Sequence, residues 1–132
     1  MIYLIGEMDM GNINPSKTEL TVTKNIESVR NSILTCLKTR NGKIIVSNDN
    51  YIECELGSLL KARVLGEFFI KKETLPRKAE INLEKLDNGE IKVNIFIKDT
   101  HKYGIKMGYI KKYEKVLNDD LEMIISAINK KV

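Results

Sequence analysis

The strongest constraint on this fold is a pair of alternating segments at residues 77–86 (RKAEINLEKL) and 90–99 (EIKVNIFIKD). Apolar residues recur at every second position in each segment, which is typical of a strand that buries one face. Residues 87–89 (DNG), between them, favour a tight turn. The pattern predicts an antiparallel hairpin whose inward side chains are Ala79, Ile81, Leu83, Ile91, Val93, Ile95 and Ile97.

Two further stretches alternate in the same way. Residues 18–23 predict a short strand with Leu20 and Val22 on one face. Residues 43–57 predict a second hairpin that turns at residues 48–50 (NDN). Its inward side chains are Ile44, Val46, Ile52, Cys54 and Leu56.

Two segments have helical periodicity instead. Residues 25–40 predict a helix of about four turns, with Asn25 as its N-cap and Asn41 and Gly42 as its stop. Residues 108–130 predict a longer helix with one apolar stripe. The stripe consists of Ile110, Tyr113, Leu117, Leu121, Ile124 and Ile128, widened by Val116 and Ile125.

Together these elements predict one α+β domain over residues 18–132. An antiparallel sheet of about five strands has one apolar face to bury, and two amphipathic helices are available to cover that face. The chain of 132 residues is long enough for a single hydrophobic core. Residues 1–17 form either an N-terminal arm or an extra edge strand, and both alternatives stay open.

The element order over about residues 18–130 resembles the TATA-binding-protein-like fold and its larger relatives, the START-like helix-grip domains. The resemblance rests on element order, and no sequence motif adds to it. The helix-grip resemblance implies an apolar ligand held between the sheet and the long C-terminal helix. The TATA-binding-protein resemblance implies DNA on the outer face of the sheet.

Charge on the expected outer face argues against DNA there. The TATA-binding family also uses two copies of the unit, whereas this chain has one. Acidic and basic residues nearly balance on this face, which is not the footprint of a phosphate-binding surface. The acids are Glu19, Glu53, Glu55, Glu80 and Glu84, and the bases are Lys43, Lys78, Lys92 and Lys98.

The basic character of the chain comes from one segment, residues 57–78. Its six bases and two acids (Glu67 and Glu73) give +4, which is the net charge of the whole chain. Such a local excess would suit an anionic partner, whether a protein, a nucleic acid or a small ligand. A solvated, lysine-rich edge is the alternative. The predicted contact residues are Lys61, Arg63, Lys71, Lys72, Arg77 and Lys78.

A second, weaker candidate lies at the start of the last helix. Glycines and lysines at a helix N-terminus can hold an anion, although the spacing here is not that of a phosphate-binding loop. Solvated lysines are the alternative, and the sequence favours them. The residues of this candidate anion site are Gly104, Lys106, Gly108, Lys111 and Lys112.

No pattern in the sequence points to catalysis, a metal or a cofactor. His101 is the single histidine, so the chain lacks enough His and Cys ligands for the common zinc sites. We expect Cys36 and Cys54 to be reduced and buried. Asp119 and Asp120 are adjacent on a helix, so their side chains point apart and cannot act as a pair. We also expect no membrane segment and a cytoplasmic location.

The function predicted from the sequence is therefore a non-catalytic binding module that contacts an anionic partner through residues 57–78. One alternative is a helix-grip carrier of a small apolar ligand beneath the C-terminal helix. Another is a structural protein that self-associates into a homo-oligomer through the N-terminal arm.

Overall fold

The computed structural model describes residues 13–57, 75–100 and 107–130. Its elements follow the predicted order of strand, helix, four strands and helix, which confirms the α+β class. They are β1 (Ser16–Val22), α2 (Ile26–Thr39), β2 (Lys43–Ser47), β3 (Tyr51–Leu56), β4 (Arg77–Lys85), β5 (Ile91–Asp99) and α4 (Met107–Asn129).

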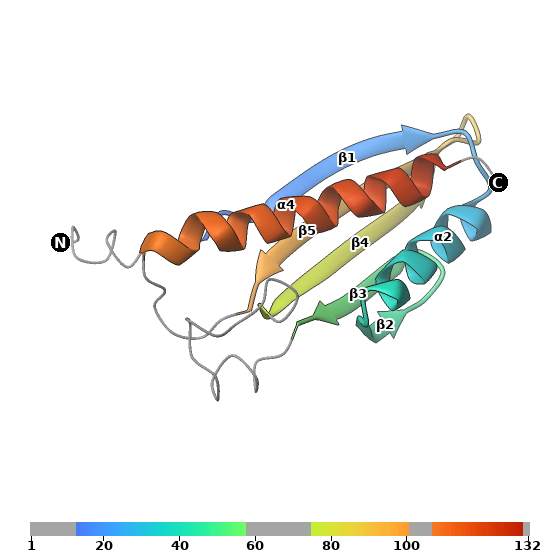
Figure 1. The fold of residues 1–132 in the computed structure, drawn as a ribbon. Coiled ribbons are helices and arrows are strands. Elements are labelled where there is room, and N and C mark those ends of the chain that lie inside the picture. The colour runs from blue at the N-terminus through green and yellow to red at the C-terminus, as the bar shows by residue number, and fades with distance from the viewer. Residues whose placement is uncertain (1–12, 58–74, 101–106, 131–132) are drawn as a thin grey trace, which may run out of the picture.

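The five strands form one antiparallel sheet in the order β1-β5-β4-β3-β2 (Figure 1). Strands β4 and β5 form the predicted hairpin, in register from Arg77 opposite Asp99 to Lys85 opposite Ile91. Gly89 in the connecting turn has φ +88°, a conformation that favours glycine. The hairpin with the clearest alternation in the sequence therefore lies in the interior of the sheet, between β1 and β3.

Helix α2 begins and ends at the residues that the sequence predicts. The Asn25 side chain accepts hydrogen bonds from the backbone N–H groups of Glu27 and Ser28, as an N-cap does. At the other end Asn41 adopts φ +60° and Gly42 N–H donates to the carbonyl of Leu37 at 2.9 Å. A Cβ on Gly42 would lie 2.5 Å from Cys54 Sγ, so this close approach of helix and sheet requires glycine.

Both helices cover the same face of the sheet (Figure 1). Helix α4 packs on β1 and β5, while α2 contacts β4 and α4. The apolar stripe of α4 and the predicted inward rows of β3, β4 and β5 meet in one core. The buried members of the stripe and of these rows are at most 6% exposed, while Ile110 and Ile125 of the stripe are partly buried against the core. The core residues from the stripe are Tyr113, Val116, Leu117, Leu121, Ile124 and Ile128.

The outer face of the sheet carries ion pairs rather than a basic surface. Lys78 pairs with Glu53 at 3.4 Å and Lys98 with Glu80 at 3.7 Å. Lys92 lies 3.8 Å from Glu84 and 3.9 Å from Glu19. Each exposed pair contributes about 0–1 kcal/mol, and together they neutralise the face.

The structure differs from the predictions at both edges of the sheet. Strand β1 begins at Ser16, two residues before the predicted start, and Ile13 ahead of it packs into the core. Asn14 N–H also donates to Glu114 Oε2 at 2.8 Å, so residues 13–17 belong to the domain. At the other edge a β-bulge between Ile44 and Val46 interrupts β2 and leaves Ile45 43% exposed.

Among the described residues, no helix is both long enough and apolar enough to cross a membrane.

The same substitution should have unequal effects at a buried and an exposed isoleucine. Ile81→Ala removes a side chain that is 0% exposed and should lower the free energy of unfolding by about 2–5 kcal/mol. Ile45→Ala, at 43% exposure, should cost less than about 1 kcal/mol. Urea denaturation followed by circular dichroism measures both, and equal losses would contradict the core described here.

Candidate functional site

Helices α2 and α4 lie side by side and run antiparallel, and a contact joins them at each end of α2. The Lys24 ammonium, just ahead of α2, donates to the backbone carbonyls of Ile128 and Lys130, the latter at 2.9 Å. Arg40, just after α2, pairs with Asp120 of α4 at 3.1 Å and also contacts the Met123 sulfur. These contacts hold the two helices together at both ends of α2.

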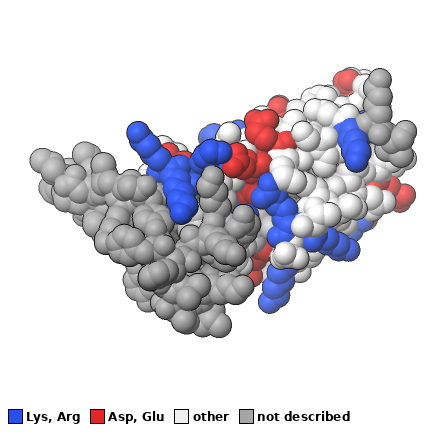
Figure 2. Space-filling view, in the orientation of Figure 1, with Lys and Arg blue, Asp and Glu red and all other residues white. Residues whose placement is uncertain are grey.

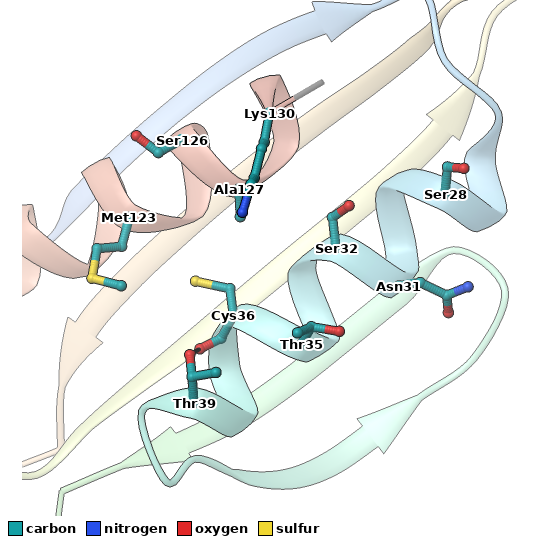
Figure 3. Close-up of a pocket in the computed structure, with 10 residues that line it drawn as sticks. All are labelled: Ser28, Asn31, Ser32, Thr35, Cys36, Thr39, Met123, Ser126, Ala127 and Lys130. Atoms are coloured by element: carbon teal, nitrogen blue, oxygen red, sulfur yellow. Dashed lines mark hydrogen bonds between the residues drawn. The ribbon is translucent and has the colours of Figure 1, made fainter. Parts of the chain in front are cut away.

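A groove of about 560 Å³ lies between these two contacts, and we call it the α2–α4 groove (Figure 3). Figure 2 shows a mostly uncharged surface, with scattered Lys and Arg side chains, over the right half of the face that carries the helices. The groove is lined by Ser28, Asn31, Ser32, Thr35, Cys36 and Thr39 of α2, by Met123, Ser126 and Ala127 of α4, and by Lys130.

Carbon and sulfur make up most of the wall of this groove. Cys36, at 8% exposure, directs its sulfur from α2 toward α4, and Met123 and Ala127 face it from α4 (Figure 3). Burial raises the pKa of the Cys36 thiol, so this thiol is neutral and behaves as an apolar group. Five hydroxyl groups add hydrogen-bonding capacity along the groove, from Ser28, Ser32, Thr35, Thr39 and Ser126.

Short side chains at helical spacing leave this space open. Ser28, Ser32, Thr35 and Thr39 form one row along α2, beside the buried row of Val29, Ile33 and Leu37. This groove was not predicted from the sequence. The available signal was the row of short residues beside the apolar stripe of α2.

A buried ion pair lies beyond the Arg40 end of the groove. Arg77 and Asp120 are 2% and 1% exposed, and the Arg77 Nε and Nη2 groups donate to the two carboxylate oxygens, the latter at 3.3 Å. Arg77 Nη1 also donates to the carbonyl of Leu75 at 2.8 Å. With Arg40 on the same carboxylate, this cluster ties the start of β4 and the end of α2 to α4.

The basic segment of residues 57–78 is described only at its ends. Including Arg77 among exposed contact residues was wrong, because its guanidinium is buried and paired with Asp120. Lys78 lies on the outer face of the sheet, where it pairs with Glu53. The other four predicted contacts lie outside the described residues and stay a prediction: Lys61, Arg63, Lys71 and Lys72.

The candidate anion site at the start of α4 is also described in part. Gly104 and Lys106 lie outside the described residues. Gly108 is in the first turn of α4, Lys111 is exposed and Lys112 is half-buried. The site stays a prediction.

The described residues hold no group of three His, Cys, Asp or Glu side chains that could bind a metal ion. Asp119 and Asp120 occupy different environments, as their adjacent helical positions predict. Asp119 is partly exposed and lies 3.3 Å from Lys115, whereas Asp120 is buried against Arg77. Cys36 and Cys54 are both buried and not disulfide-bonded, as expected.

No family model and no curated protein matches this chain. Among solved structures, that of Ara h 8.0201 is similar at 11% identity and a TM-score of 0.45, over 87% of this chain and 94% of that one. That of DR_A0006 from Deinococcus radiodurans is similar at 12% identity and a TM-score of 0.32, over 83% of this chain and 92% of that one. At these scores we base no inference on either likeness, and the fold class follows from the strand order and packing of the chain itself.

The two adjacent aspartates allow a matched test of the buried ion pair. Asp120→Asn removes the carboxylate from the buried Arg77 and should lower the free energy of unfolding by about 3–5 kcal/mol. Asp119→Asn loses only an exposed pair with Lys115 and should cost about 0–1 kcal/mol. Chemical denaturation of both variants measures the difference, and similar losses would show that the buried pair contributes no more than the exposed one.

The buried thiol of Cys54 predicts loss of stability in alkali. Burial, together with the nearby Asp120 and Glu55 carboxylates, raises its pKa from 9.0 to about 11. The unfolded chain therefore ionises first, and the free energy of unfolding falls as the pH rises from about 9 toward 11. Cys54→Ala should make this fall shallower in denaturation curves recorded at several pH values, and an unchanged fall would assign it to other groups.

Proposed function

We propose that this chain is a binding protein that holds a small, largely apolar molecule in the α2–α4 groove. The observation that carries the proposal is the groove itself, with a volume of about 560 Å³ and a wall mostly of carbon and sulfur. Pockets for small molecules commonly span roughly 300–1,000 Å³ and combine apolar walls with a few polar groups. The hydroxyl groups along this groove would supply those polar contacts.

Affinity would come mainly from removing apolar surface from water. Cys36, Met123 and Ala127 offer such surface to a ligand, at about 25 cal/mol for each Å² buried. The contacts of Lys24 and Arg40 hold the helices together without a ligand, so little ordering would be needed on binding. A groove that is already formed therefore supports binding of a small molecule.

This proposal places the ligand on a different side of α4 from the one that the helix-grip resemblance implies. Between α4 and the sheet, the buried apolar side chains of α4, from Tyr113 to Ile128, are closely packed in the core. The side of α4 that faces α2 is where the described residues leave space.

The two other functions stay predictions. Of the basic residues expected to meet an anionic partner, the two described ones, Arg77 and Lys78, each pair with a carboxylate of this chain. Of the arm expected to mediate self-association, residues 1–17, the first twelve residues lie outside the described part of the chain.

A neutral apolar dye, N-phenyl-1-naphthylamine, tests the proposal. We expect the dye to gain fluorescence with the protein, and Ser32→Phe to reduce this gain by roughly tenfold, because the ring would occupy the groove. Thr21→Phe is the matched control, since it places the same ring on the opposite face of the sheet and should leave dye binding unchanged.

Labelling of Cys36 locates the dye. In a Cys54→Ala background, saturating dye should slow the reaction of Cys36 with N-ethylmaleimide severalfold, because this thiol lines the groove. Dye binding that leaves the labelling rate unchanged, and that Ser32→Phe does not weaken, would place the dye elsewhere and overturn the proposal.

A further inference from the structure

Among the described residues, the lining of the α2–α4 groove has one charged side chain, and that side chain is a cation. Lys130 lies just beyond the last turn of α4, and Figure 3 shows its side chain running back along the helix toward Ala127. None of the lining residues that the structure describes is acidic. Within the described part of the chain, no carboxylate pairs with the Lys130 ammonium.

The surroundings of Lys130 add to this positive character. Because the helices are antiparallel, the N-terminus of α2, which carries the positive end of the helix dipole, lies beside the C-terminus of α4. The C-terminus of α4 would oppose an anion, but the Lys24 ammonium binds its carbonyls at Ile128 and Lys130 and offsets their partial charge. Glu27, in the first turn of α2, is exposed and is not part of the lining.

The opposite end of the groove is less suited to a charged group. Its lining there consists of Cys36, Thr39 and Met123. Arg40 is close by, but its guanidinium is engaged by Asp120 and the Met123 sulfur and is not part of the lining. The groove is therefore polarised along its length, with a cation at one end and an apolar surface at the other.

From this polarity we infer that the groove takes an amphipathic anion, with its acidic head at Lys130 and its apolar body along Cys36 and Met123. The inference rests on the proposed function and names the chemical class of the ligand. The Ser28 and Ser32 hydroxyls at the same end of the groove can donate hydrogen bonds to the acidic head. The ammonium of Lys130 adds a charge-assisted contact that a neutral ligand of the same length lacks.

Three ten-carbon probes that differ in head group test this inference: decanoate, 1-decanol and decyltrimethylammonium. Each is titrated against the N-phenyl-1-naphthylamine complex at low salt, and displacement of the dye gives its affinity. We expect decanoate to bind roughly three- to tenfold more tightly than 1-decanol, and the cation to bind most weakly. Salt should reduce the preference for decanoate, since Lys130 is solvent-exposed.

Variants at Lys130 assign that preference to one side chain. Lys130→Gln should remove most of the difference between decanoate and 1-decanol, and Lys130→Glu should favour decyltrimethylammonium over decanoate. Lys115→Gln is the matched control, because it removes a lysine from α4 that pairs with Asp119 and does not line the groove. This control should keep the full preference for decanoate.

The outcomes separate this inference from the proposed function. If 1-decanol and decanoate displace the dye equally well, or if the preference for decanoate survives in Lys130→Gln, the anion inference is wrong while small-molecule binding stands. If none of the probes displaces the dye while the dye still slows Cys36 labelling, the anion inference alone is wrong. If neither the dye nor any probe slows Cys36 labelling, both are wrong.

Discussion

The path of the chain between the two edges of the sheet is the constraint from which the rest of the structure follows. Strands β1 and β2 lie at opposite edges, and α2 connects them across the apolar face. The aliphatic rows of the sheet point to this face and must be buried. Helix α4 therefore covers the part of the face that α2 leaves open. Two helices on one face become neighbours, and the side chains between them decide whether the space is filled. Here those side chains are short, and a groove is left.

Polar contacts then fix how the helices sit. A buried ion pair is seldom a net gain over apolar packing, but breaking one is costly, so it penalises alternative arrangements of the elements that carry it. Arg77 at the start of β4 and Asp120 in α4 meet in one place, and Arg40 from the end of α2 joins them. We regard this cluster as the feature that sets the position of α4 along the sheet, with Lys24 acting at the far end.

Much of this fold could be predicted from the sequence, because the strand and helix periodicities are clean. The alternating pattern predicts that Ala79 and Ile81 point inward, and both side chains are buried in the structure. Arg77 lies two residues before Ala79, so the same alternation predicts that it is buried. It was instead counted with the other charged residues of segment 57–78 as a contact residue. Asp120 likewise falls between Val116 and Ile124 on the buried side of α4. That these two charges meet depends on strand order and helix placement, which periodicity does not encode. The groove was missed for the same reason, since the gap between two helices depends on how the sheet sets them apart.

The bulge in β2 affects how readily another chain can add to this edge of the sheet. An outermost strand with three successive β-branched residues, Ile44, Ile45 and Val46, is the kind of segment onto which a further chain can add. The extra residue kinks the backbone and breaks the regular spacing of its N–H and C=O groups. Arg30 covers the end of the same strand by donating to the Ser47 hydroxyl at 2.7 Å and the Asn48 carbonyl at 2.9 Å. This border of the sheet is thereby made a poor template, and a strongly aliphatic strand can lie at the surface without seeding aggregation.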